Sequence, residues 1–140
     1  MDNGDDTVTD NCTGLMWQQD TADIGNDGTI TDADDVRLWC DAITYCEELT
    51  FGAGNHTDWR LPNVRELHSL VDFSRESPAI DTDFFAATAG GNRAYWSSTS
   101  IASSNGDCEW IVFFDTGRLS SVCRPVEEAH GHVRAVRDAQ

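Results

Sequence analysis

The chain has 140 residues, of which 39% are hydrophobic, and a formal net charge of −16 in which all nine basic residues are arginines. A chain of this length and apolar content forms a single domain, residues 1–140, with a hydrophobic core, which excludes a disordered acidic tail. The charge argues against nucleic acid, anionic lipid and sulfated polysaccharide as partners, and it favours cations, neutral sugars or basic surfaces. No apolar run is long enough to cross a membrane, so membrane insertion is not expected.

The first third of the chain predicts a hairpin followed by a helix. Residues 7–9 and 15–17 have strand composition with a turn between them, which is typical of an N-terminal β-hairpin. After a polar loop, apolar side chains recur at helical spacing over residues 35–49. Asp32 or Asp34 is expected to cap the start of this helix.

A second helix is predicted to begin at a well-defined residue. Asn63 follows Pro62 at a helix N-cap position, and Glu66 three residues later completes a capping-box pattern. Apolar side chains then continue at helical spacing, so the helix is expected to run to about Phe73 with one buried stripe. Residues 74–94 have no periodicity and predict a loop.

The last third of the chain has the composition of a sheet. Strands are predicted at residues 95–99, 109–114, 118–123 and 132–138. The segments 100–107 and 124–131 between them are predicted to be loops. The order of hairpin, helix, helix and antiparallel sheet indicates an α+β fold.

The five cysteines are many for a cytosolic chain of this size, and none stands in a Cys-x-x-Cys zinc pattern. Cys108 and Cys123 flank a predicted hairpin and can face each other across it, while Cys12 can reach Cys40 or Cys46. Cys40 and Cys46 point in different directions on one predicted helix, so they are not expected to pair. We expect an oxidising compartment, two disulfides and one remaining thiol. The alternative is five reduced cysteines in the core.

The polar loop before the first helix contains the best pattern for a metal site. When an EF-hand calcium loop is laid on residues 23–34, oxygen donors fall at four ligand positions and a glycine falls at the sharp turn. The four candidate ligands are Asp23, Asp27, Thr29 and Asp34. Gly25 at the third position, an Asp in place of the closing Glu and the lack of an entering helix depart from the EF-hand. The pattern predicts a structural calcium ion, and the alternative is an Asp/Asn/Gly turn without an ion.

Three arginines lie next to predicted core positions in this carboxylate-rich chain, namely Arg60, Arg134 and Arg137. The planar guanidinium group suits bidentate pairing with carboxylates. We therefore expect these side chains to pair with acids such as Glu66 or Asp72 and to hold helix to sheet.

Four short motifs are spread over nearly the whole chain. They are Thr-Gly-Leu-Met-Trp at 13–17, Asp-Trp-Arg-Leu-Pro at 58–62, Tyr-Trp-Ser-Ser-Thr at 95–99 and Val-Arg-Ala-Val-Arg at 133–137. In this order they resemble the C-terminal domain family of the Legionella collagen-like adhesin. The resemblance implies a C-type-lectin-like fold, with the terminal strands meeting in a sheet and two helices packed beside it. It also implies an adhesin that binds sulfated glycosaminoglycans, but the acidity of this chain would repel sulfates, so that ligand is not carried over. The family's trimer is not carried over either, because this sequence contains no collagen repeat.

Binding residues are often placed on loops of a rigid scaffold. The predicted loops 100–107 and 124–131, and the strands between them, mix polar side chains with one tryptophan, which suits adaptable polar recognition. The candidate ligand-binding residues are Ser103, Asn105, Asp107, Trp110, Arg118, Ser120, Arg124, Glu127 and His130.

The sequence does not favour an enzyme, because its serines lack a Gly-x-Ser-x-Gly elbow and its histidines lack a fixed metal-ligand spacing. The leading hypothesis is a secreted or cell-surface bacterial module, adhesin or lectin-like, that binds a glycan or protein ligand. One alternative is a structural or assembly domain of a larger surface protein. Another is a binding protein diversified by a retroelement, because C-type-lectin-like domains serve as targets of such elements. The oligomeric state is left open.

Overall fold

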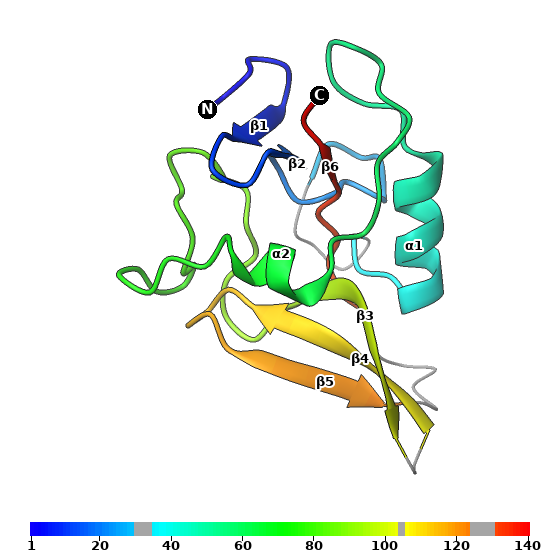
Figure 1. Ribbon diagram of the computed structural model, residues 1–140. Coiled ribbons are helices and arrows are strands. Elements are labelled where there is room, and N and C mark those ends of the chain that lie inside the picture. Colours follow the sequence, from blue (N-terminus) through cyan, green and yellow to red (C-terminus); the bar gives the residue numbers. More distant parts are fainter. Residues whose placement is uncertain (30–34, 104–105, 124–130) are drawn as a thin grey trace.

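The computed structural model describes residues 1–29, 35–103, 106–123 and 131–140, and within them it has an α+β fold with two short helices and two three-stranded antiparallel sheets (Figure 1). The first sheet has the order β1-β2-β6 and comprises β1 (Thr7–Asp10), β2 (Leu15–Gln18) and β6 (Val136–Asp138). The second has the order β3-β4-β5 and comprises β3 (Ala94–Ser103), β4 (Gly106–Phe113) and β5 (Leu119–Cys123). The helices are α1 (Trp39–Glu48) and α2 (Val64–His68).

The first sheet joins the two ends of the chain. β1 pairs with β2 along its whole length, which confirms the predicted N-terminal hairpin. β6 pairs with the opposite edge of β2, where Met16 faces Arg137 in the register. The two termini therefore lie at the same end of the molecule, away from the β3-β4-β5 sheet (Figure 1).

The prediction of one antiparallel sheet is wrong, because the strands divide between two sheets with α2 between them (Figure 1). The predicted closing strand at 132–138 is also shorter than expected. The carbonyls of Val133 and Ala135 accept hydrogen bonds from the backbone N–H groups of Ala22 and Gln18, so this segment bonds to the end of β2 and the chain after it before β6 begins.

The second sheet is longer than predicted. Both ends of β3 pair with β4, at residues 94–96 and 100–103, and the register shifts between Trp96 and Ser100. The predicted loop at 100–107 is therefore wrong, since its described residues lie in strands; Ala102, for example, pairs with Asp107. The Ser- and Ala-rich composition suggested a loop, but pairing with β4 supplies backbone partners regardless of side-chain propensity.

One of the two predicted disulfides is present. Cys108 and Cys123 are bonded and lie directly opposite each other on β4 and β5, as expected. The second predicted disulfide is wrong: Cys12 and Cys40 are exposed free thiols, and Cys46 is a buried free thiol. Burial raises the pKa of Cys46 to about 12, so this side chain acts as a small apolar group in the core.

Helix α1 is shorter than the predicted helix at 35–49. Its N-cap is Leu38, which makes no side-chain capping bond, so the expected cap by Asp32 or Asp34 is wrong; both aspartates lie outside the described residues. Asp35 is buried before the helix begins and bonds to the preceding loop. In the described part of the chain, no helix is long and apolar enough to span a membrane.

Helix α2 begins as predicted and ends early. The side chain of Asn63 accepts from the backbone N–H of Glu66, and the carboxylate of Glu66 accepts from the backbone N–H of Asn63, which confirms the capping box. The helix ends at His68 rather than near Phe73. The chain then joins a bridge in which the N–H of Asp72 donates to the carbonyl of Ala79, so its backbone bonds are made outside the helix.

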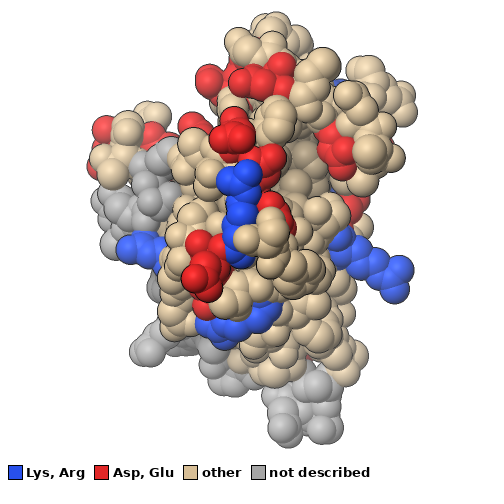
Figure 2. All heavy atoms as spheres, turned by 90° about the vertical axis from the view of Figure 1, so that its left-hand side faces the viewer, with Lys and Arg blue, Asp and Glu red and all other residues tan. Residues whose placement is uncertain are grey.

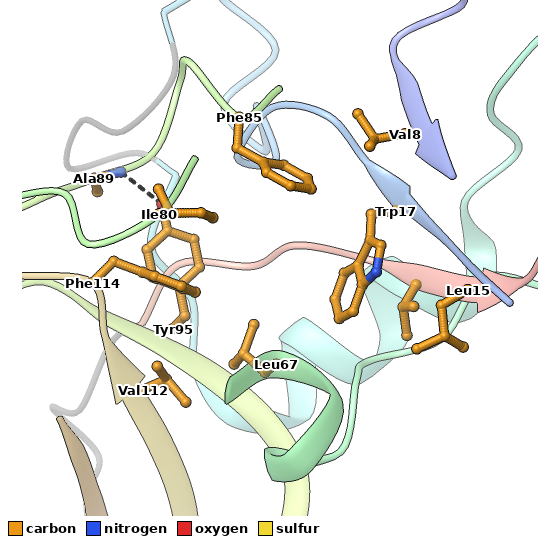
Figure 3. Close-up of a cluster of buried hydrophobic side chains, with 11 residues drawn as sticks. Val8, Leu15, Trp17, Leu67, Ile80, Phe85, Ala89, Tyr95, Val112 and Phe114 are labelled. Atoms are coloured by element: carbon orange, nitrogen blue, oxygen red, sulfur yellow. Dashed lines mark hydrogen bonds between the residues drawn. The ribbon is translucent and has the colours of Figure 1, made fainter. Parts of the chain in front are cut away.

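The core consists of two clusters. In the first, Leu67 of α2 packs between Trp17 of the first sheet and Val112 and Tyr95 of the second (Figure 3). The Tyr95 hydroxyl accepts a 2.7 Å hydrogen bond from the backbone N–H of Ala89. The second cluster lies against α1 and includes Ala42, Cys46, Trp59, Trp96, Ile111 and Val133.

Arg134 is a charged side chain inside the core, with 1% of its surface exposed. Its guanidinium donates to the carbonyls of Gln18, Gln19 and Ala87, and to the hydroxyl of Thr88 at 2.8 Å. These four partners are neutral oxygens, and the prediction of a carboxylate partner is wrong for this arginine. The side chain ties the end of β2 to the loop before β3.

The other two arginines do pair with acids. Arg60 makes a bidentate pair with Glu66 at 2.8 and 2.9 Å, as expected. Arg137 makes a bidentate pair with Asp58 at 2.7 and 3.1 Å, not with the predicted Glu66 or Asp72. Asp58 and Arg137 belong to two of the sequence motifs, and their pairing joins the segment before α2 to β6.

We predict that Arg134→Lys lowers the free energy of unfolding by about 2–4 kcal/mol, because an ammonium group cannot bond all four oxygens and leaves buried carbonyls unsatisfied. Urea unfolding followed by tryptophan fluorescence measures the change. Arg75→Lys is the control: Arg75 is 39% exposed and pairs with Asp72 and Asp81 at the surface, so its replacement should change stability by less than about 0.5 kcal/mol. Equal losses in the two variants would contradict the role given to Arg134.

We predict that the contribution of the Asp58–Arg137 pair to stability disappears in acid. Hydrogen bonds from Arg137 lower the pKa of Asp58 below its unfolded value of about 3.9. The contribution is therefore complete above that value and is lost as the pH falls through the lower pKa of the folded state. Because Asp58 is 59% exposed, we expect about 1 kcal/mol. The difference in unfolding free energy between the wild type and Asp58→Asn should be largest at neutral pH and should shrink as the pH falls below about 3.9; a constant difference would refute the pairing.

Candidate ligand-binding site

The structure places only part of the predicted ligand-binding set. Asn105, Arg124, Glu127 and His130 lie outside the described residues. Ser103 is the last residue of β3, where its backbone pairs with the start of β4. The remaining four residues are Asp107, Trp110, Arg118 and Ser120, which belong to β4, β5 and the turn that joins them.

These four residues do not form one patch. Trp110 lies opposite Ser121, while Ser120 lies opposite Ile111, and successive residues of a strand point to opposite faces of the sheet. Trp110 and Ser120 therefore belong to different faces. Asp107 is exposed towards the start of β4.

Arg118 is held by contacts within the chain. Its guanidinium carbon lies 3.7 Å from the ring centroid of Phe113. Its nitrogens bond to Asp115 at 3.3 Å and to the side-chain oxygen of Asn92 at 2.5 Å. These contacts fix the turn between β4 and β5, which is a structural role.

The predicted metal loop folds back on its own backbone. The two carboxylate oxygens of Asp23 accept from the N–H groups of Asp27 at 3.3 Å and Gly28 at 3.0 Å. Asp27 in turn accepts from the N–H of Thr29 at 2.8 Å. Asp34, the predicted closing ligand, is outside the described ranges, and within those ranges no three acidic, His or Cys residues gather as a metal group. Calcium binding by this loop stays a prediction.

Two hollows flank α1. The larger, which we call the Tyr45 pocket, has a volume of about 430 Å³ and is lined by Gln18, Asp23, Ile24, Asn26, Tyr45, Leu49 and Phe51. The other, which we call the Glu47 groove, has a volume of about 350 Å³ and is lined by Ile43, Glu47, Arg60, Leu61, Asn63, Glu66 and Ser98. Residues four apart share a helix face, so Tyr45 and Leu49 lie on one side of α1, and Ile43 and Glu47 lie on another.

The polar groups of the Tyr45 pocket are positioned by the fold. The amide nitrogen of Gln18 donates to the Tyr45 hydroxyl at 3.2 Å, and its amide oxygen accepts from the N–H of Ala135. Asp23 is oriented by the backbone of its own loop. Burial raises the pKa of Tyr45, and the nearby negative charges of Asp23 and Asp35 raise it further, so this phenol is neutral at physiological pH.

This combination of residues suits a small polar ligand. Ligand sites pair apolar and aromatic walls with a few well-placed polar groups. Here Ile24, Leu49 and Phe51 supply apolar surface, while Asp23 and Tyr45 can hydrogen bond to a ligand. The Glu47 groove differs, because its Arg60 is already paired with Glu66.

The sequence indicated only one member of this pocket, Asp23. Gln18 follows a predicted strand, Tyr45 lies beside the apolar stripe of a predicted helix, and Phe51 follows that helix. The position of Tyr45 outside the stripe was the one signal that it is not a central core residue. Nothing in the sequence places it against residues 18 and 23.

Comparison with known proteins identifies a family. A family model described as the Lcl C-terminal domain matches residues 6–137, a range that contains both helices and extends from β1 into β6. No curated protein and no solved structure matches the chain.

Proposed function

Because the chain belongs to the Lcl C-terminal domain family, we propose that it is an extracellular or surface-displayed bacterial module that captures a ligand, in the manner of an adhesin or lectin. The Cys108–Cys123 disulfide supports this location, since such bonds persist in oxidising compartments. We also propose that the fold is C-type-lectin-like. The meeting of the terminal strands in the β1-β2-β6 sheet, with two helices beside it, supports that assignment.

The observation that carries the proposal is the Tyr45 pocket. It joins aromatic, amide and carboxylate side chains from three separate segments, and its volume of about 430 Å³ suits one sugar residue or one protruding side chain. We assign the recognition of a glycan or protein ligand to this pocket rather than to the divided surface of β4 and β5. We propose binding, and not catalysis, as the role of this pocket.

The surface charge restricts the ligand. Acidic side chains form scattered patches on the face drawn in Figure 2, and arginine side chains lie directly beside some of them. Ion pairs at the surface, such as those of Arg75 with Asp72 and Asp81, neutralise part of the positive charge of the arginines. With a formal charge of −16, the protein would repel sulfated or nucleic-acid ligands and would attract neutral or basic ones.

We propose calcium as a structural ion of the 23–34 loop. Asp23, Ile24 and Asn26 of this loop line the Tyr45 pocket, so an ion there would order one wall of the site. Because such an ion would also neutralise Asp23, calcium and a cationic ligand are alternatives at this carboxylate. The carboxylates available for it include Asp23 and Asp27, whose oxygens also hold the turn.

We predict that the protein binds a member of a glycan and matrix-protein panel, and that Tyr45→Ala weakens this binding at least tenfold by removing the aromatic wall. Asn26→Ala, an exposed change in the same pocket, should weaken it less. Glu47→Ala, in the groove on another side of α1, is the matched control and should leave binding unchanged. Each variant is checked by thermal melting, and the panel is run with calcium and with EDTA.

The outcomes separate the alternatives. A lower melting temperature in EDTA supports the calcium proposal, and a melting temperature that EDTA leaves unchanged refutes it. Full binding by folded Tyr45→Ala and Asn26→Ala removes the pocket from the proposal. An absence of binding across the panel favours a structural or assembly domain of a larger surface protein.

A further inference from the structure

Asp23 gives the described lining of the Tyr45 pocket its one formal charge. Asp23 lines it, and in the described chain this carboxylate makes hydrogen bonds to backbone N–H groups but no ion pair with an arginine. Behind it, the buried carboxylate of Asp35 accepts from the N–H groups of Ile24 at 2.8 Å and Gly25 at 3.3 Å. The described lining contains no basic residue. Two carboxylates thus hold one turn at the pocket wall.

The Glu47 groove offers a contrast within the same molecule. Its lining has two acids, Glu47 and Glu66, and one base, Arg60, which forms a bidentate pair with Glu66. Both hollows border the same helix and have similar volumes, about 430 and 350 Å³. The Glu47 groove thus contains a cation next to its acids, and the described lining of the Tyr45 pocket does not.

The other walls fit the remainder of a cationic ligand. Tyr45 and Phe51 are aromatic, and the electron-rich face of an aromatic ring attracts ammonium groups. Ile24 and Leu49 supply apolar surface against which the alkyl stem of a lysine packs. The raised pKa of Tyr45, caused mainly by burial and partly by Asp23 and Asp35, agrees with a negative potential at this site.

We infer that the Tyr45 pocket recognises an alkylammonium group, such as the lysine side chain of a protein partner. This inference rests on the proposed binding function and specifies the chemistry of the ligand. Asp23 supplies the counter-charge, the two aromatic residues contact the cation, and the aliphatic residues contact its stem. A neutral sugar would bind without the charge of Asp23, and the experiment below distinguishes it from an alkylammonium ligand.

The experiment titrates the full chain with N-acetyl-lysine methylamide and follows backbone NMR shifts at low salt. We expect weak binding, with shifts grouped at Ile24, Asn26 and Tyr45. N-acetyl-norleucine methylamide and the Nε-acetylated lysine probe keep the stem but lack the charge, and they should not produce these shifts. Raising the salt from about 20 to 300 mM should weaken lysine binding, because screening acts on the charge of Asp23.

The key variant is Asp23→Asn, which keeps an oxygen acceptor for the loop N–H groups while removing the charge. It should weaken lysine binding about fivefold, the size expected of a partly exposed ion pair. Glu47→Gln in the other hollow is the control and should have no effect. NMR shifts throughout residues 23–28 of the free variant would show that Asp23→Asn alters the loop. In that case the salt dependence and the acetylated probe, both measured on the wild type, still test whether binding needs the charge of the ligand.

Equal binding of the charged and acetylated probes, or shifts centred on the Glu47 groove, would overturn the inference. A panel ligand whose binding depends on Tyr45 but not on the charge of Asp23 would overturn it while leaving the proposed function in place. Lysine binding in the pocket without any panel ligand would support the inference and count against a glycan ligand.

Discussion

The position of the Tyr45 pocket depends on the buried guanidinium of Arg134. Its bonds to Gln18 and Gln19 fix the end of β2, and its bonds to Ala87 and Thr88 fix the loop that precedes β3. Gln18 is also the residue that bonds to the Tyr45 hydroxyl. The buried guanidinium of Arg134 therefore fixes the position of Gln18, which forms part of one wall of the pocket. The aromatic ring of Phe85, 4.8 Å from the guanidinium carbon, is a further neighbour that does not carry negative charge.

Helix α1 divides the surface into two chemically different sites. Its two sides contribute Tyr45 to one hollow and Glu47 to the other, while its third side carries Ala42 and Cys46 into the core. The hollow at Glu47 contains the Arg60–Glu66 ion pair beside the acid Glu47. In the hollow at Tyr45, the carboxylate of Asp23 accepts hydrogen bonds from backbone N–H groups. These bonds hold the carboxylate in place without cancelling its charge. This difference is why the two sites are expected to select different ligands.

Local sequence signals predicted the parts of the fold that are stabilised locally. The hairpin and the capping box of α2 were predicted because their bonds join residues close in sequence. The motif resemblance predicted the family, and that prediction is confirmed. The division into two sheets, the oxygen cage of Arg134 and the Tyr45 pocket depend on contacts between distant segments. Segment 100–107 shows the same limit: its composition favours a loop, and its partner strand overrides that preference.

The meeting of the chain ends in the β1-β2-β6 sheet has a mechanical consequence. Both terminal strands are edge strands of this sheet, with β2 between them. Tension applied between the two ends would pass from β1 to β2 to β6 through their backbone hydrogen bonds, which are the shortest route across the molecule. The β3-β4-β5 sheet lies at the opposite end and would carry little of that load (Figure 1). Gln18 ends the central strand of the loaded sheet and lines the Tyr45 pocket, so a pull strong enough to separate these strands would distort that pocket before it reached the distant sheet.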